Sequence, residues 1–436
     1  MPGPDTVMLA WHELELGLFF HWDIEVFQPE WDGTPEHLPE PDVFRPSALD
    51  IEQWMDTAVS SGARYALITA KHDTGFCLWP TRVHDYHVGT AGCPDIVGLF
   101  VRACRERGIV PGVYYSLRGK YLEKMCRDAS GNLDRIMLND LLVRQLNELL
   151  DTYGPFGEIW FDGGIRRMDL GGPNLVELIR KKAADTVIFG GCPGMDHVLR
   201  WSGSEQGIAL PDTWSTSHWR SEPWGNITCD APGSSEDEVW APVEVDTPIR
   251  ENLCAWMGGW FWKAGEEHLT VPETILFERY LTSVGRNSNM LIGVTPDTRG
   301  QIPEDECRSL TGLGRRVREA FSAPAGISET MTGTSMEIRF PEMMDIEYVD
   351  IWEDQTLGQH VLEFAVEILW PKSWCTEGER WIEVFRGKSI GHRRIVPLGI
   401  IRAEAVRVRI LSWKGEAVLR CFRAFGSRSL QEEKKS

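Results

Sequence analysis

The feature that most constrains the fold is an alternation of apolar, strand-length runs with helical patterns over roughly the first 300 residues. The apolar runs are too hydrophobic to expose one face to water, which is typical of parallel strands covered on both faces. Such runs cover residues 16–22, 64–71, 109–116, 158–163, 186–191 and 289–294. The helical patterns between them have clear ends. One begins after Asp50, a typical N-cap residue, and ends at Gly62, a typical C-cap residue.

This long strand–helix alternation favours a (β/α)8-like TIM barrel over an open, doubly wound sheet. The dinucleotide-binding fingerprint G-x-G-x-x-G follows none of the candidate strands, which weakens the Rossmann alternative. Residues 201–272 interrupt the alternation and are rich in Trp, Pro, Gly and Ser. Because long irregular insertions in a compact barrel are usually functional, we expect loops of the active site in this region.

From residue 333 the hydrophobic period changes to two, and short alternating segments are separated by turn residues. This pattern is typical of an all-β sandwich. We therefore predict a catalytic barrel domain over residues 1–325, a C-terminal β-sandwich domain over residues 333–427 and a polar tail over residues 428–436.

The composition excludes some partners. The chain has 65 acidic residues against 45 Lys and Arg residues, a net charge of −20, which disfavours binding to nucleic acid or to an anionic membrane.

Nineteen tryptophans offer flat apolar faces that suit sugar rings, although a Trp-rich core explains any single one equally well. The ten cysteines form no C-x-x-C pair, and no signal-peptide or membrane-span pattern is present, so we expect a cytoplasmic protein with free thiols. The sequence does not indicate the oligomeric state.

Polar side chains follow four of the candidate strands. They are His21, the group Lys71-His72-Asp73, the pair Tyr115-Ser116, and Asp162. Because the active site of a β/α barrel lies at the carboxyl ends of its strands, these four endings predict one shared site. Trp160 and Asp162 alternate onto the same side of their strand, so the indole is placed to flank the carboxylate. Gly163 and Gly164 then clear space beside it.

Each of these residues also has a structural interpretation. A strand-end histidine is often hydrogen-bonded within the fold, and an aspartate there is often the cap of the next helix. Two histidines, His84 and His87 in "HDYH", lie three positions apart, but no third ligand pattern is nearby. We therefore predict no metal site.

Taken together, several motifs make the chain similar to the α-L-fucosidases of glycoside hydrolase family 29. The resemblance runs nearly end to end and rests on 17–22 (GLFFHW), 70–80 (AKHDTGFCLWP), 112–116 (GVYYS), 159–163 (IWFDG) and 283–300 (SVGRNSNMLIGVTPDTRG). The last motif, with "WAPVEVDTPIR" before it and "VFRGKSIGHRRI" near the C-terminus, is more similar to the branch that acts on α-1,3/1,4-linked fucose.

The resemblance implies a retaining exo-glycosidase that needs no cofactor and acts on fucosylated oligosaccharides or glycans. It implies that Asp162 is the nucleophile. Retention needs a second carboxyl group about 5–5.5 Å from the first, to protonate the leaving oxygen. Glu205 in "WSGSEQG", 43 positions after Asp162, matches the acid/base of the family, and Glu244 in "PVEVD" is the second candidate.

The resemblance also implies a set of sugar-binding residues. They are His21, Glu30, Trp31, His72, Asp73, Tyr115 and Trp160, with Trp262 or Phe19 as the apolar wall for the fucose methyl group. The chain departs from the family at Asp73, where a second histidine is usual and where a carboxylate can only accept hydrogen bonds. Two alternatives therefore stay open: a related sugar such as an α-L-galactoside, and a non-catalytic carbohydrate-binding protein.

Overall fold

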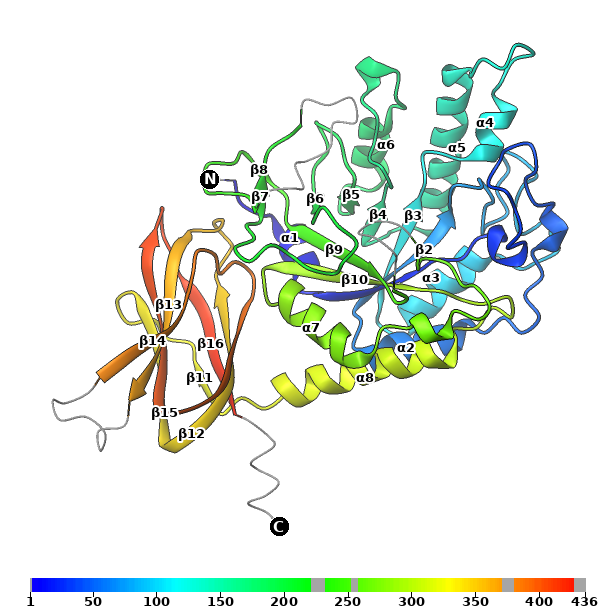
Figure 1. The fold of residues 1–436 in the computed structure, drawn as a ribbon. Coiled ribbons are helices and arrows are strands. Elements are labelled where there is room, and N and C mark those ends of the chain that lie inside the picture. Colours follow the sequence, from blue (N-terminus) through cyan, green and yellow to red (C-terminus); the bar gives the residue numbers. More distant parts are fainter. Residues whose placement is uncertain (1, 221–231, 252–257, 371–379, 427–436) are drawn as a thin grey trace.

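The structure is a computed structural model that describes residues 2–220, 232–251, 258–370 and 380–426. Within these residues, parallel strands close into an eight-stranded barrel in the order β1-β10-β9-β6-β5-β4-β3-β2 (Figure 1). The strands are β1 (Leu16–Phe20), β2 (Tyr65–Lys71), β3 (Val110–Tyr115), β4 (Glu158–Trp160), β5 (Val187–Phe189), β6 (Val198–Trp201), β9 (Val243–Pro248) and β10 (Ser288–Val294). The barrel predicted from the sequence is confirmed.

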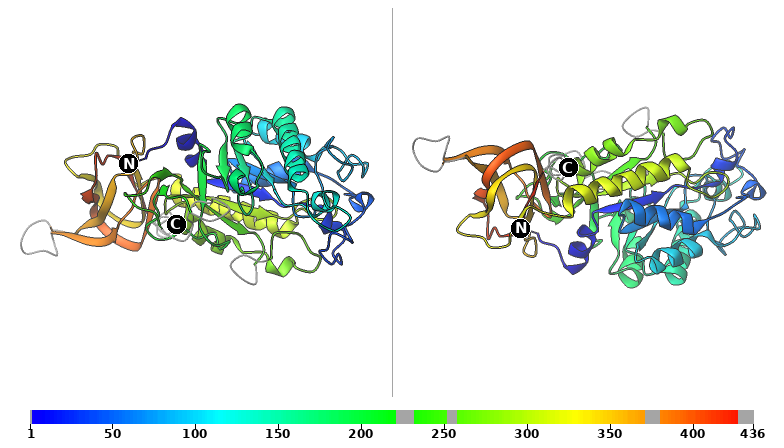
Figure 2. Two further views of the ribbon diagram at one scale, coloured as in Figure 1. Left: turned by 90° about the horizontal axis from the view of Figure 1, so that it is seen from above. Right: turned by 90° about the horizontal axis from the view of Figure 1, so that it is seen from below.

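Helices surround most of the barrel (Figure 2). They are α1 (Thr6–His12), α2 (Ile51–Ser61), α3 (Ile96–Glu106), α4 (Lys120–Met125), α5 (Arg135–Tyr153), α6 (Leu175–Lys182), α7 (Glu273–Ser283) and α8 (Glu304–Phe321). Helix α2 begins and ends as its sequence predicts. At its start, Asp50 accepts a hydrogen bond from the Gln53 amide. At its end, Gly62 has a φ of +85°, which residues other than glycine rarely adopt. Among the described residues, no helix is both long and apolar enough to cross a bilayer.

Two barrel strands, β6 and β9, escape the sequence prediction. Residues 201–272 are not wholly irregular, because β9 and the short pair β7 (Thr216–Ser217) and β8 (Val239–Trp240) lie within them. The physical reason is that β9 turns two acidic side chains, Glu244 and Asp246, into the barrel, where both are buried. They remove the apolar run by which buried parallel strands are recognised. The part of this insertion at residues 221–231 lies outside the described residues.

The barrel interior and the barrel–helix interface are separate hydrophobic clusters. The interior cluster is strongly aromatic and includes Phe19, Tyr65, Tyr114, Trp160 and Phe189. Alternation along each strand sends the neighbouring side chains outward into the larger cluster against the helices. The aromatic interior therefore fills the barrel directly below its carboxyl-end opening.

The C-terminal region is one antiparallel sheet in the order β11-β16-β12-β15-β13-β14, and its side chains enclose a hydrophobic cluster of their own. The strands are β11 (Gly326–Ser328), β12 (Ser335–Glu353), β13 (Val361–Trp370), β14 (Arg380–Gly387), β15 (Arg394–Trp413) and β16 (Leu419–Gly426). The predicted all-β domain is confirmed. However, the sequence indicates only short strands, whereas β12 and β15 are long strands of 19 and 20 residues, and their pairing shifts register between Arg339 and Met344 and between Ile346 and Tyr348. The predicted tail at 428–436 lies outside the described residues.

A buried ion-pair network joins the two domains. Helix α8 runs along the barrel toward the C-terminal sheet (Figures 1 and 2). Just before β15, Arg393 donates to Asp350 of β12 and, across the domain boundary, to Glu15 and to the Tyr280 hydroxyl of α7. Glu15 immediately precedes β1, so the arginine ties the first barrel strand to the C-terminal sheet.

Candidate active site

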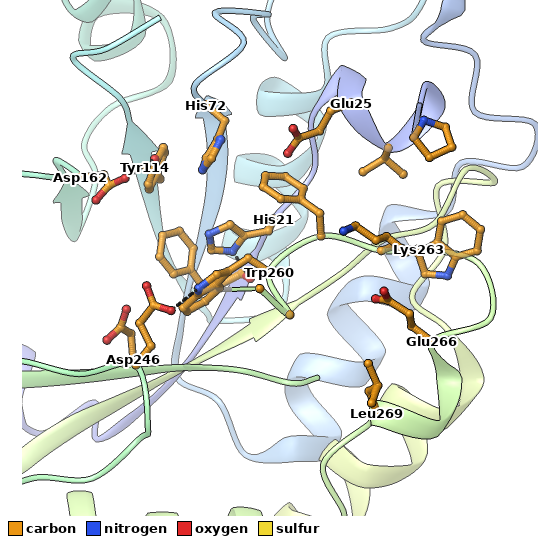
Figure 3. A pocket seen from close by; sticks show the side chains of 18 of the residues that line it. His21, Glu25, His72, Tyr114, Asp162, Asp246, Trp260, Lys263, Glu266 and Leu269 are labelled. Carbon is orange, nitrogen blue, oxygen red and sulfur yellow. Dashed lines mark hydrogen bonds between the residues drawn. The ribbon is translucent and has the colours of Figure 1, made fainter. Parts of the chain in front are cut away.

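A pocket of about 750 Å³ opens at the carboxyl ends of the barrel strands (Figure 3). This is the place where β/α barrels hold their active sites. Aromatic side chains make up much of its wall, namely Phe19, Tyr114, Trp31, Trp160, Trp260, Phe261 and Trp262. The carboxyl groups that line it include Asp162 beyond β4, Glu205 beyond β6, and Asp246 on β9.

Asp162 is exposed to the pocket and is held by a neighbouring strand. The Tyr114 hydroxyl of β3 donates a hydrogen bond to Asp162 Oδ2 over 3.0 Å. Burial and the adjacent Asp162 charge raise the pKa of Tyr114 well above its usual value, so the phenol stays protonated and keeps donating. Gly163 follows with a φ of +66°, and an added Cβ there would lie 3.1 Å from Arg118 Nη2, so glycine suits this turn.

Glu205 and Asp246 are held by two indoles. Trp260 donates its Nε1–H to Glu205 over 2.9 Å, a bond drawn dashed in Figure 3, and Trp201 donates to Asp246 over 2.6 Å. Asp246 is buried, and its burial, with a smaller contribution from the Glu205 charge, raises its pKa well above the usual range. The pocket therefore combines an exposed carboxylate, a half-buried carboxyl group and a buried one whose protonated form is favoured.

His21 is a buried, neutral imidazole in the pocket wall. Its Nδ1 lies 3.2 Å from the Phe19 carbonyl, which can only accept, so Nδ1 carries the proton and Nε2 keeps its lone pair. Burial, together with the neighbouring His72, holds the pKa of His21 well below its usual value. Nε2 is therefore an acceptor for a sugar hydroxyl.

His72 reaches the pocket through an irregularity in β2. In the pairing with β3, Thr69 faces Tyr114 and Lys71 faces Tyr115, so one residue of β2 is skipped. This bulge turns Lys71 outward over the Tyr115 ring and His72 inward, where its ring stacks on Tyr114 at 5.1 Å. Bulges of this kind are common beside active sites because they re-aim side chains.

Near-parallel rings continue this stack around the barrel. Tyr114 lies 5.6 Å from Trp160, and Trp160 lies 3.9 Å from Phe189, with interplanar angles of 18° and 7°. Of these four rings, His72 directly follows β2, and Tyr114, Trp160 and Phe189 lie on β3, β4 and β5 in turn. We call them the ring column. It carries the pocket wall at His72, Tyr114 and Trp160.

Tyr115 is not a pocket residue, so this part of the predicted site is wrong. Its side chain points outward, is buried, and donates to Gln145 Oε1 of α5 over 2.9 Å. Adjacent strand residues face opposite sides, and the inner tyrosine of the pair is Tyr114. Both neighbours are tyrosine, so residue type could not separate them, although counting the alternation from the interior would have done so.

Glu244, the second acid/base candidate, lies beneath the pocket and does not line it. It is fully buried and accepts hydrogen bonds from Tyr65 over 2.7 Å and from Trp160 over 3.1 Å. Burial and the adjacent Glu158 raise the pKa of Glu244 well above its usual value, and Glu158 Oε1 has no hydrogen-bond partner among the described residues. A carboxyl group enclosed in this way cannot reach a leaving oxygen. Its neighbour Asp246, two positions further along the strand, reaches the pocket and was missed by the sequence prediction.

The remaining predicted residues divide into two groups. His21, His72, Trp31, Trp160, Trp262 and Phe19 all line the pocket. Glu30 and Asp73 are not among its lining residues: Glu30 is exposed, and Asp73 forms an ion pair with Lys120. The sequence prediction of Asp73 as a sugar-reading residue is therefore not supported by its position.

The histidines of "HDYH" serve the loop that holds them. His84 Nδ1 accepts from the Tyr86 amide over 3.1 Å, and His87 Nδ1 accepts from the Gly89 amide over 3.0 Å. Within the described residues, metal-like spacing occurs in one group, Asp23, Glu25 and His72. In that group, both carboxylate oxygens of Asp23 accept a hydrogen bond from the Thr74 hydroxyl.

A parallel barrel whose carboxyl-end pocket combines separate carboxyl groups with aromatic walls is an arrangement typical of glycoside hydrolases. The family model for alpha-L-fucosidase matches residues 36–319, so the chain belongs to the α-L-fucosidase family. This confirms the family predicted from the motifs of the sequence.

Proteins of known sequence and structure resemble the chain over nearly its whole length. It is 28% identical to a putative alpha-L-fucosidase 1 of Oryza sativa subsp. japonica, over 98% of this chain and 85% of the relative. It is 26% identical to alpha-L-fucosidase 1 of Arabidopsis thaliana, over 94% and 84%. A crystal structure of a putative alpha-L-fucosidase from Bacteroides thetaiotaomicron superposes with a TM-score of 0.86 at 28% identity, covering 98% of this chain and all of that one.

Proposed function

We propose that the protein is a retaining exo-α-L-fucosidase that removes terminal α-L-fucosyl residues from oligosaccharides or glycoconjugates. Asp162 is the nucleophile and Glu205 the general acid/base. The observation that carries this proposal is the convergence of the two carboxyl groups, from β4 and from the segment after β6, on one aromatic-walled pocket. Each carboxyl group is oriented by an aromatic donor, Tyr114 or Trp260.

The chemistry is a double displacement. The Asp162 carboxylate attacks the anomeric carbon while Glu205 gives its proton to the departing glycosidic oxygen. A covalent fucosyl ester on Asp162 results. Glu205, now a carboxylate, takes a proton from a water molecule that attacks the same carbon, and fucose leaves with its original configuration. The reaction balances without a cofactor.

Substrate recognition follows from the pocket wall. His21 Nε2 accepts from one sugar hydroxyl, and His72 and Trp31 lie where further hydroxyls or the ring face would meet the wall. Phe19 and Trp262 supply apolar surface for the C6 methyl group. The α-1,3/1,4 linkage preference rests on the sequence motifs, as does the cytoplasmic location, and both stay predictions.

Hydrolysis of a glycoside of a related sugar is the second candidate function. The position of Asp73 is the observation that favours it. The family histidine at this position is replaced by a side chain outside the pocket lining, so one hydroxyl contact of the family is missing here. An α-L-galactoside carries a C6 hydroxyl in place of the methyl hydrogen. A panel of aryl α-L-glycosides separates the two substrates by the ratio of their kcat/KM values.

The nucleophile is tested with Asp162→Ala. We expect loss of turnover on an aryl α-L-fucoside, partial recovery with azide, and a β-L-fucosyl azide product, because azide then attacks the open face in one displacement. NMR of the wild-type reaction should show the α-anomer of fucose first. Asp151→Ala, on the outer helix α5, is the matched control. Full activity of Asp162→Ala, or fucose binding without hydrolysis of any fucoside, would refute the proposal.

A further inference from the structure

An ion pair lies where three loops around the pocket meet. Asp73 lies just after β2, and its carboxylate pairs with the ammonium of Lys120, the first residue of α4 beyond β3. The same ammonium lies 4.9 Å from the ring centroid of Trp31, which belongs to the segment after β1. Of the three residues, Trp31 alone lines the pocket.

The ion pair contributes little to holding these loops together. The Lys120 amide donates to the Asp73 carbonyl over 2.9 Å, and the Tyr121 amide donates to the Thr74 carbonyl over 3.1 Å. These backbone bonds already join the two loops. The side chains of Asp73 and Lys120 are 45% and 25% exposed, a range in which ion pairs add little to stability. Removing the pair should therefore leave the protein folded.

What the ion pair does fix is the position of the Lys120 ammonium. A lysine side chain has four rotatable bonds, and a carboxylate at its end selects one arrangement from many. In that arrangement the cation covers one face of Trp31, where the ring quadrupole attracts it. Trp31 is also anchored at its edge, because its Nε1–H donates to the Thr34 carbonyl over 3.2 Å. The indole held in this way also lines the pocket.

We propose that Asp73 and Lys120 are positioning residues that set the indole of Trp31 for the sugar, and that Asp73 acts on the substrate only through Lys120. The proposal rests on the proposed function, since it concerns the same pocket. Asp73, the residue that departs from the family pattern, then has a role that needs no contact with the sugar. In this protein the Lys120 ammonium over Trp31 orders this part of the pocket wall.

The test is a double-mutant cycle on an aryl α-L-fucoside, with KM and kcat measured for Asp73→Asn, Lys120→Met and the double variant. Lys120→Met should raise KM about two- to five-fold and change kcat less than about two-fold, since a ground-state contact of cation–π size is lost. Asp73→Asn should raise KM when Lys120 is present and have no further effect in the Lys120→Met background. Lys120→Arg should restore KM, because a guanidinium also stacks on an indole.

An equal effect of Asp73→Asn in both backgrounds would show that Asp73 contacts the sugar itself, and would overturn the proposal. Unchanged KM in Lys120→Met would overturn it as well. The matched control is Lys182→Met with Asp151→Asn, an ion pair of similar exposure, 24% and 55%, that lies away from the pocket. If wild-type protein hydrolyses no fucoside, the proposed function fails, and calorimetry of fucose binding by the same variants still tests the positioning role.

Discussion

Tyr114 donates a hydrogen bond to Asp162 over 3.0 Å, and the two side chains come from neighbouring strands of the barrel. The phenol is buried and stacked between His72 and Trp160, so it cannot turn away from the carboxylate. The bond therefore fixes one oxygen of the proposed nucleophile and leaves the other for the anomeric carbon.

Replacing Tyr114 by Phe should lower kcat on an aryl fucoside by about ten- to one hundred-fold and change KM little. A hydrogen bond to a charged group contributes about 1.5–3 kcal/mol, and the lost donor releases the orientation of Asp162. Tyr115→Phe is the matched control, because its hydroxyl faces α5 and kcat should be unchanged. Equal losses of kcat in both variants would contradict the assignment of Tyr114 as the orienting residue.

The general acid can be identified from the leaving-group dependence of the rate. Glu205→Ala should lose far more activity on a fucoside with a poorly acidic leaving group than on a dinitrophenyl fucoside, which departs without protonation. Asp246→Asn and Glu244→Gln should show no such difference, because Asp246 is a neighbour of the acid and Glu244 lies below the pocket. A leaving-group dependence confined to Asp246→Asn would transfer the role to Asp246.

The buried pair Glu158–Glu244 should make stability fall as pH rises. Burial raises the pKa of Glu158 to about 7 and that of Glu244 well above its usual value. Below pH 4.5 both the folded and the unfolded chain hold the protons. Between pH 4.5 and 7 the unfolded chain loses them while the folded chain keeps them, so unfolding becomes easier, and above pH 7 the Glu158 contribution levels off.

Glu158→Gln should remove that part of the pH dependence. The amide still accepts from Trp11 Nε1 and can donate to Glu244. In urea unfolding, the variant should gain stability relative to wild type between pH 4.5 and pH 8, by up to about 3 kcal/mol. Glu304→Gln, at a largely exposed position, should leave the profile unchanged. Parallel wild-type and Glu158→Gln profiles would show that the pair carries no shared proton.

Arg393→Met should lower the free energy of unfolding by about 3–5 kcal/mol at pH 7, because Glu15 loses its arginine partner and the buried Asp350 is left with Arg423 alone. Burial opposes ionisation of Glu15, yet Arg393 lowers its pKa to about 2. The stabilisation by Glu15 is therefore present above pH 4.5 and lost as pH falls toward 2, and the variant should lose less over that range. Arg308→Met, in an exposed pair, is the control; equal urea midpoints for the two variants would count against the network.

Whether a barrel strand can be predicted from the sequence depends on which side chains it turns into the barrel. Runs such as 64–71 and 289–294 are uniformly apolar and could be recognised as buried strands. Strand β9 could not, because Glu244 and Asp246 break its apolar character while being buried by indole and phenol donors that only the closed barrel brings together. The period-two pattern of the C-terminal domain was clear, but it could not show where two segments join into one long strand.

The same limit applies to the site. Asp162 could be located because a carboxylate after an apolar run and before two glycines is unusual. Tyr114 and Tyr115 could not be told apart by residue type, since the choice depends on which face of β3 is inside. The partner of Asp73 could not be foreseen, because Lys120 lies 47 positions away and meets it only across two loops.

The positions of the rings in the ring column, and so of the pocket wall that they form, depend on how the barrel strands pair. Its rings are spaced at 3.9–5.6 Å, close to the ~4.8 Å that separates neighbouring strands, because each ring stands on its own strand or directly after it. A ring of another size at Phe189, which does not line the pocket, should shift Trp160 and the rings stacked after it. Natural variants that accept new sugars should therefore keep these four rings and differ in the loops above them, where one residue can change without its neighbours.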